Sequence, residues 1–129
     1  MKRTIAATIA ALTIGITPAP AHSATGRCTQ YEQLLTVNAP KGGWNIAKMS
    51  RTMWRESRCQ PTATNRTGHD AGLLQIHPIS WRWLEQRLNT PINGRTLLDP
   101  TLNIRAAAAL CTYWRQAGRS CYRPWRGGA

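Results

Sequence analysis

The apolar positions in the middle of the chain recur with the period of a helix. Three of them are spaced by three and four residues and therefore share one helix face: Ile46, Met49 and Met53. Asn45, directly before this stretch, has a side chain suited to capping a helix start. Pro61 disfavours helical backbone at the residue before it, so this helix is predicted to end near Cys59.

Similar patterns predict two short helices on either side. The first starts near Thr29, which has Glu32 three positions later in a capping-box pattern, and breaks at Pro40. Another is predicted from Ser80 through Leu88. Together with the central helix they indicate a helical domain.

A longer helix is predicted near the C-terminal end. Asp99 and Pro100 form a good start, because proline is favoured at the first helical position, and Gly118 closes the helix. Its inward face carries Ile104, Ala107, Cys111 and Trp114. The small alanines at 106–109 allow close packing, so this helix is predicted to be the centre of the core.

Residues 62–76 lack a helical period and are rich in turn formers. They predict a loop or small hairpin that enters a brief apolar strand, Leu73 to Ile76. The predicted fold class is mainly α (α+β), with a small β-hairpin after the second helix.

The N-terminal segment has the composition of an export signal. Two basic residues precede an apolar run at residues 5–16, and small residues follow it. A retained membrane anchor is the alternative, but the run is well short of the roughly 20 residues that span a bilayer. We expect residues 1–24 to be a secretory signal peptide and residues 25–129 to be one domain. That domain would be extracellular or periplasmic and would meet the membrane only transiently, during export.

The chain is strongly basic, with 17 Lys and Arg against 5 Asp and Glu and a formal net charge of +12. Removal of Lys2 and Arg3 with the signal peptide would leave +10. Such a surface attracts anions such as nucleic acid, anionic lipid or an acidic cell wall. For an exported protein the wall is the nearest of these, and no nucleic-acid partner is expected. Charge alone does not identify the partner, because a basic surface can also serve only to keep the protein soluble.

All four cysteines lie in the exported part: Cys28, Cys59, Cys111 and Cys121. An even number in a small secreted chain predicts two disulfides. Three pairings are open, and Cys28–Cys59 with Cys111–Cys121 is favoured because each would join neighbouring elements. Zinc is the alternative, but the chain has no Cys-x-x-Cys pair and its histidines are not spaced to match. We expect neither a metal nor a cofactor.

Glu56 extends the apolar face of the central helix, where a carboxylate is costly. Partial burial and the negative end of the helix dipole both raise the pKa of a carboxyl in such a place. A carboxylic acid that keeps its proton near neutral pH is suited to general acid catalysis. The alternative is that Glu56 simply pairs with an arginine such as Arg55 or Arg58.

Asp70 lies among polar turn residues beside Gly68 and His69, where it is expected to be solvated and ionised. Two carboxyls in contrasting surroundings, one apolar and one wet, suit the cleavage of a glycosidic bond. An Asp in a Gly-flanked turn is also a common turn former, and that alternative stays open.

Three motifs in this segment resemble the active-site region of the lysozyme-like superfamily, which includes animal-type lysozymes and soluble lytic transglycosylases. They are Glu56-Ser57, Ala63-Thr64-Asn65-Arg66 and Asp70-Ala71-Gly72-Leu73-Leu74-Gln75-Ile76. Asp99-Pro100 with residues 103–107 resembles the later helix of lytic transglycosylases. The resemblance implies a lysozyme-like helical domain that cuts peptidoglycan at the β-1,4 bond between N-acetylmuramic acid and N-acetylglucosamine, as a lytic transglycosylase or a muramidase.

The resemblance also implies roles for single positions. Glu56 takes the place of the catalytic acid, and Asp70 falls where chicken-type lysozymes carry their second carboxylate. Gln75 matches a glutamine of the cleft floor, and Trp81 falls near tryptophans of the sugar groove. The candidate substrate-binding residues are Ser57, Gln75, His77, Trp81 and Trp125.

Each of these candidates has a plain structural alternative. Trp81 and Trp125 can be core residues, Ser57 and Gln75 can satisfy backbone groups, and His77 can be a bystander. The sequence also departs from the family patterns. The hairpin is shorter than in chicken-type lysozymes, His77 replaces an expected Asn, and the Ala-Tyr-Asn-Ala-Gly motif of many transglycosylases is missing.

Two other functions compete with a monomeric wall glycosidase that acts on peptidoglycan glycan strands. A cationic protein could bind the wall or nucleic acid through charge alone, without catalysis. An inactive lysozyme-like scaffold could serve as a structural or inhibitor protein. Replacement of Glu56 separates these from an enzyme, because only the enzyme depends on that carboxyl.

Overall fold

A computed structural model of the chain describes residue 15 and residues 27–128. Apart from Gly15, the predicted signal peptide lies outside the described residues. Between residues 27 and 128 the elements are η1 Thr29–Tyr31, α1 Glu32–Gly42, α2 Ile46–Ser57, η2 Pro78–Ser80, α3 Trp81–Leu88, η3 Thr96–Leu98, α4 Pro100–Gln116 and η4 Arg123–Gly128, where η marks a 3-10 helix. The mainly α class is confirmed. No described helix is long and apolar enough to cross a bilayer.

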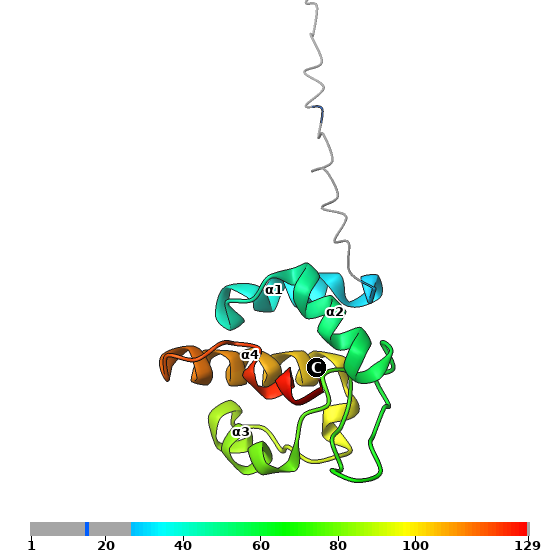
Figure 1. Cartoon of the computed structure of the whole chain (residues 1–129), viewed down its shortest axis with the longest axis vertical. Coiled ribbons are helices and arrows are strands. Elements are labelled where there is room, and N and C mark those ends of the chain that lie inside the picture. Colours follow the sequence, from blue (N-terminus) through cyan, green and yellow to red (C-terminus); the bar gives the residue numbers. More distant parts are fainter. Residues whose placement is uncertain (1–14, 16–26, 129) are drawn as a thin grey trace, which may run out of the picture.

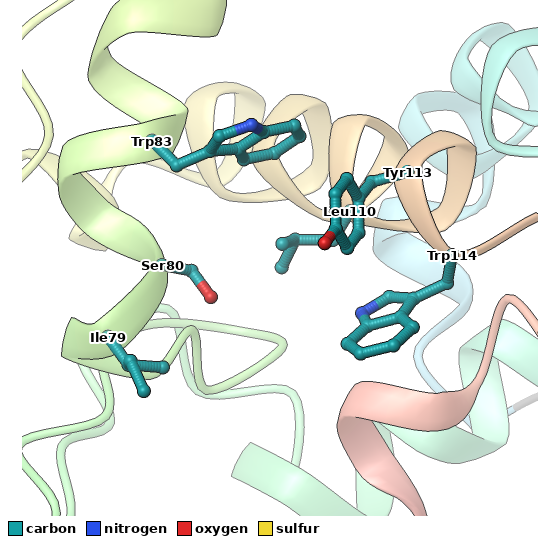
Figure 2. Close-up of a pocket in the computed structure, with 6 residues that line it drawn as sticks. All are labelled: Ile79, Ser80, Trp83, Leu110, Tyr113 and Trp114. Atoms are coloured by element: carbon teal, nitrogen blue, oxygen red, sulfur yellow. The ribbon is translucent and has the colours of Figure 1, made fainter. Parts of the chain in front are cut away.

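Helix α4 is the centre of the core, as predicted. Figure 1 shows it between α1 and α2 on one side and α3 on the other, and it packs against both α1 and α3. The Asp99 side chain caps it by accepting a hydrogen bond from the Leu102 amide at 2.8 Å, with Pro100 at the first helical position. The alanines at 106–109 are all buried, which brings α1 close. Toward α3, the rings of Trp83 and Tyr113 meet edge to face with centroids 5.2 Å apart (Figure 2).

The predicted boundaries hold for α2 and shift for α1. Asn45 caps α2 by accepting a hydrogen bond from the Lys48 amide at 2.9 Å. Helix α1 begins later than predicted, after the 3-10 turn η1, and runs through Pro40. It ends where Gly43 takes a left-handed conformation at φ 68° and donates from its amide to the Ala39 carbonyl.

The predicted β-hairpin and the strand Leu73 to Ile76 are wrong. Residues 58–77 form a loop whose only pairing is two isolated antiparallel bridges, Thr64 with Ala71 and Ala71 with Ile76. Gly72 and Gln75 have φ values of 80° and 44°, which curl the backbone within this short stretch. An extended ladder cannot pass through two left-handed residues.

A buried asparagine of α4 holds this loop. Asn103 is fully buried, and its Nδ2 donates to the carbonyls of Ala71 and Leu97, both at 2.9 Å. Its Oδ1 accepts from the Leu74 amide at 2.9 Å. At Gly72 an added Cβ would lie 2.1 Å from the Leu97 carbonyl oxygen. Only glycine therefore allows the loop backbone to pack this closely against Leu97. The segment that carries Asp70 and Gln75 is therefore fixed to the core helix.

Two disulfides close the fold in the pairing that the sequence favours. Cys28–Cys59 joins the start of the helical region to the end of α2, and Cys111–Cys121 joins α4 to the segment before η4. The second bond turns the C-terminal segment back toward α2, so that η4 lies near the end of that helix (Figure 1).

Candidate active site

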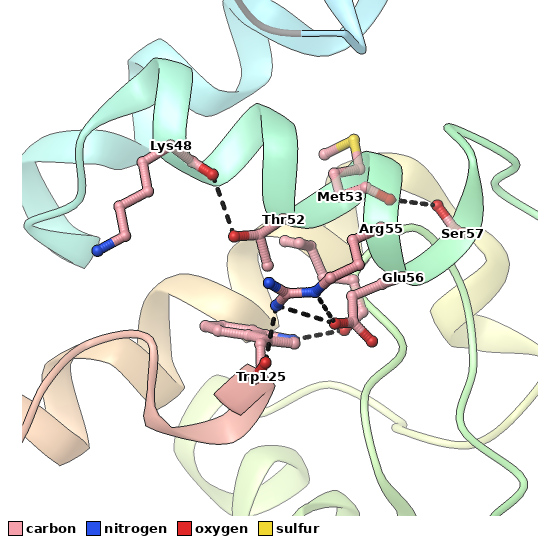
Figure 3. A network of polar contacts seen from close by, with 8 residues as sticks. Lys48, Thr52, Met53, Arg55, Glu56, Ser57 and Trp125 are labelled. Atoms are coloured by element: carbon pink, nitrogen blue, oxygen red, sulfur yellow. Dashed lines mark hydrogen bonds and ion pairs between the residues drawn. The ribbon is translucent and has the colours of Figure 1, made fainter. Parts of the chain in front are cut away.

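Glu56 projects from the last turn of α2, on the face that its spacing predicts. Met49 and Met53 of the same face are fully buried. The glutamate follows them at the edge of the core, with 23% of its side chain exposed. Figure 3 shows it pointing away from α2 toward Trp125 of η4.

Arg55 pairs with this carboxyl and also binds the C-terminal segment. Its Nε and Nη2 donate to Oε1 of Glu56 at 3.3 and 3.2 Å. The same Nη2 donates to the backbone carbonyl of Trp125 at 2.7 Å. The arginine-pair alternative therefore describes a real contact, made by the half-exposed Arg55.

Burial nevertheless controls the proton affinity of Glu56. Loss of solvation raises its pKa, and this outweighs the lowering by the Arg55 hydrogen bond and charge. The charge of Asp70 raises the pKa further as the smallest influence. The pKa of Glu56 lies above the usual value of a glutamate, so its proton persists to higher pH.

Asp70 is more enclosed than its sequence context suggests. Its Oδ2 accepts a hydrogen bond from Nδ2 of Asn65 at 2.5 Å. Its Oδ1 is buried and accepts no hydrogen bond from the described residues. Asn65 also accepts from the amides of Gly68 and Asp70, which folds the loop around the carboxylate. The expected wet aspartate is therefore only half-exposed.

Three candidate substrate-binding residues make local backbone contacts. The buried Ser57 donates to the Met53 carbonyl at 3.1 Å. Gln75 donates from Nε2 to the carbonyls of Ala63 and Gly72, both at 2.9 Å. His77 accepts from the Ile79 amide at Nδ1 and caps η2. These contacts match the structural alternatives that the sequence left open for Ser57 and Gln75.

The sequence comparison decides the family. The family model for the transglycosylase SLT domain matches residues 42–120, more than half of the chain. The chain belongs to this family. The SLT domain is a lysozyme-like superfamily domain, so the resemblance read from the motifs is confirmed. Membership implies peptidoglycan as the substrate and points to lytic transglycosylase activity. No curated protein and no solved structure matches the chain. The two disulfides fit an extracytoplasmic location of this SLT domain.

The two predicted sugar-binding tryptophans of the SLT domain differ in exposure. Trp81 is half-buried, donates from Nε1 to the Ile76 carbonyl at 3.0 Å, and lines a hollow of about 460 Å³ together with Asn65 and His69. Trp125 is only 4% exposed, and its Nε1 donates to the Leu74 carbonyl at 2.7 Å. Trp125 is therefore a core residue beneath Glu56, and it offers no exposed face to a sugar.

The sequence reasoning missed a second aromatic hollow of the SLT domain. About 350 Å³ in volume, it lies between α3 and α4 and is lined by Ile79, Ser80, Trp83, Leu110, Tyr113 and Trp114. Figure 2 shows the three aromatic rings around this common space. The available signal was the presence of aromatic residues on two predicted helices, because Trp83 and Tyr113-Trp114 both fall on helical segments.

No metal site is evident in the part of the SLT domain that the structure describes. Within residues 27–128, no group of three or more His, Cys, Asp or Glu side chains is placed to hold a metal ion.

Proposed function

We propose that this chain is an exported peptidoglycan lytic transglycosylase in which Glu56 is the general acid. The bond cut is the β-1,4 bond between N-acetylmuramic acid and N-acetylglucosamine. One observation carries the proposal: in an SLT domain, a half-buried glutamate at the end of α2 has its pKa raised by burial in spite of a paired arginine.

Glu56 would act twice in one cycle. It first donates its proton to the glycosidic oxygen as the bond from C1 of N-acetylmuramic acid breaks, and the bonding electron pair stays on that oxygen. Positive charge develops at C1 and the ring oxygen. The Glu56 carboxylate then takes the proton of the C6 hydroxyl, whose oxygen bonds to C1 of the same sugar. The products are a free N-acetylglucosamine hydroxyl and a 1,6-anhydro ring, and Glu56 is protonated again.

Arg55 would support the ionised half of this cycle. Its guanidinium already binds Oε1, so it stabilises the carboxylate that appears when the proton leaves. Its third contact, to the Trp125 carbonyl, fixes the guanidinium in place. We therefore assign Arg55 as a positioning residue.

The surroundings of Asp70 favour the intramolecular product over hydrolysis. One carboxylate oxygen is bound by Asn65 and the other is buried, which suits a residue that shapes its loop. Attack by a hydroxyl of the substrate itself needs no second carboxylate to activate water. A muramidase, in which Asp70 assists hydrolysis, is the runner-up.

Aromatic side chains are the candidates for sugar contact. Sugars present apolar C–H faces that dock on indole and phenol rings. Trp81 remains a candidate from the sequence, and Trp83, Tyr113 and Trp114 of the second aromatic hollow join it. Both hollows have the volume of a small ligand site.

Replacement of Glu56 with Gln tests the proposal. We expect clearing of purified cell wall to fall by about 10³-fold, within the 10²–10⁴ range of general acid catalysis. Mass spectrometry of wild-type digests should find products one water lighter than those of hydrolysis.

The folded protein gives the control for this variant. A carboxyl whose pKa is raised by folding stabilises the fold only while protonated, and this contribution is lost as pH rises through the folded pKa. At pH 7 and above, the Glu56→Gln protein should therefore unfold at a temperature no lower than the wild type. If clearing survives the substitution and is lost in high salt, the charge-driven alternative is correct.

Export has a test of its own. N-terminal sequencing of the exported protein shows whether the predicted signal peptide is cleaved between residues 21 and 24.

A further inference from the structure

A small hollow next to Glu56 is lined by three cations. It has a volume of about 170 Å³ and lies between α2 and the C-terminal segment, and its lining residues are Lys48, Thr52, Arg55, Tyr122, Trp125 and Arg126. We call it the basic hollow. None of these lining residues is acidic.

The basic hollow lies directly beside Glu56, the proposed acid. Lys48, Thr52 and Arg55 are spaced by four and three residues, so they share one face of α2. Figure 3 shows Lys48 at one end of this row and Glu56 at the other, with Arg55 between them over Trp125. A ligand in the hollow would therefore lie beside the reacting bond.

The cations of the basic hollow keep hydrogen-bond donors for a ligand. Arg55 uses Nε and Nη2 for Glu56 and Trp125, and its Nη1 has no hydrogen bond to the residues that line the hollow. The Lys48 ammonium lies 4.1 Å from the centre of the Tyr122 ring, a contact that does not neutralise its charge. The Arg126 side chain is exposed. Like charges brought together on folding repel one another, and a bound anion offsets this repulsion.

The size of the hollow selects a small anionic group. Sites for whole small molecules usually measure about 300–1,000 Å³, so the basic hollow suits one end group of a larger substrate. Peptidoglycan carries such groups, because peptide stems with free carboxylates hang from N-acetylmuramic acid, the sugar on one side of the scissile bond. Arginine and lysine bind carboxylates through charge-assisted hydrogen bonds.

We propose that the basic hollow binds a carboxylate of the peptide stem and so selects glycan strands that carry stems. This rests on the proposed function and deepens it. Lys48 and Arg126 supply the charge, while Arg55 links the bound stem to the Glu56 carboxyl.

The test compares two forms of one substrate. Peptide-bearing glycan strands are used with their stem carboxylates free, or with the same carboxylates converted to primary amides, which keeps their size and removes their charge. For the wild type, kcat/KM should be about tenfold lower on the amidated strands, the effect of a lost charge-assisted hydrogen bond. The Lys48→Gln/Arg126→Gln protein should cleave both forms equally, at the lower rate.

A matched double variant controls for net charge. Arg82→Gln/Arg105→Gln removes two charges from exposed positions of α3 and α4, and it should keep the wild-type preference for free carboxylates. The proposal is overturned if the wild type cleaves both forms equally, if the Lys48 and Arg126 variant keeps the preference, or if the control loses it as well. Amidation leaves wall phosphates untouched, so a wild type that bound phosphate in the hollow would cleave both forms equally, and this result overturns the proposal.

Failure of the proposed function gives a different result. If no enzyme form cleaves either strand, the transglycosylase assignment fails. Co-sedimentation of the same proteins with free and amidated wall then tests, by binding alone, whether the basic hollow recognises stem carboxylates. The wild type and the Arg82→Gln/Arg105→Gln control should bind the free wall more tightly than the amidated wall, and the Lys48→Gln/Arg126→Gln protein should bind both equally.

Discussion

Glu56 and Asp70 are the two carboxylates of the candidate site, and different kinds of structure hold them. Glu56 stands on a helix of 12 residues, and the methionines before it on the same face are buried in the core. Asp70 stands in a loop without regular structure, where an asparagine side chain folds around it. The regular geometry of the helix places the Glu56 carboxylate at the edge of the core, whereas the position of Asp70 depends on a few specific hydrogen bonds in the loop.

The two places also differ in how they balance charge. Glu56 has an arginine partner and still keeps its proton longer than usual, because it is removed from solvent. Asp70 has an amide partner and one buried oxygen that accepts nothing from the described residues. Arg55 therefore lowers the proton affinity of Glu56 by less than burial raises it, while the charge of Asp70 raises that affinity slightly.

Replacement of Gly72 with Ala should disrupt the loop while leaving α2 intact, and it is the largest effect on stability that we expect. The new Cβ would collide with the Leu97 carbonyl oxygen and with Asn103, at a residue with φ 80°. Overpacking and a strained left-handed residue each cost about 1–3 kcal/mol, so the free energy of unfolding should fall by about 3 kcal/mol or more. Urea unfolding measures the loss.

Gly118→Ala is the matched control. Gly118 has φ 69° but no atom within 4 Å of an added Cβ, so only the backbone strain remains, about 1 kcal/mol. Equal losses for the two variants would show that the contact with Leu97 and Asn103 does not anchor the loop.

The sequence predicts the helix part of this comparison better than the loop part. The face of α2, the caps at Asn45 and Asp99, and the central place of α4 follow from local spacing and capping chemistry. The predicted hairpin failed because Gln75 adopts a left-handed conformation, which residue type does not reveal. It also failed because the loop is held by Asn103, 29 residues beyond Leu74.

Long-range contacts also decide the place of Trp125. The sequence leaves sugar binding and core packing both open for this residue of the C-terminal segment. That segment returns to α2, where Arg55 reaches the Trp125 carbonyl across 70 residues of sequence. Periodicity predicts which face a side chain is on, but not which distant segment covers that face.

Removal of the Arg55 charge should change the proton affinity of Glu56 and leave the hydrogen bonds of Asp70 as they are. Arg55 lowers the pKa of Glu56, so Arg55→Gln raises it, and the acid keeps its proton to higher pH. The alkaline limb of the kcat/KM profile should move to higher pH. At the plateau the rate should fall by about fivefold, because the hydrogen bonds that orient the carboxyl are lost.

Two variants control for this shift. Arg51→Gln removes a charge from an exposed position one turn earlier on α2 and should leave the limb in place. Arg55→Lys keeps the charge without the forked contact and should give a smaller shift. A limb that does not move in Arg55→Gln would mean that the ion pair has no influence on the reacting group.

Asp70→Asn should give the smallest change, with the opposite sign. The negative charge of Asp70 raises the pKa of Glu56 and is the weakest of the four influences on it. Its removal lowers that pKa, so the alkaline limb should move slightly to lower pH. The rate should fall by less than about tenfold, since an asparagine can still bond to Asn65, and the product should remain the 1,6-anhydro sugar.

A loss of 10²-fold or more in Asp70→Asn, with hydrolytic product from the wild type, would instead make Asp70 a second catalytic carboxylate of a muramidase. Because the Arg55 and Asp70 variants shift the same limb in opposite directions, a general loss of stability cannot imitate both.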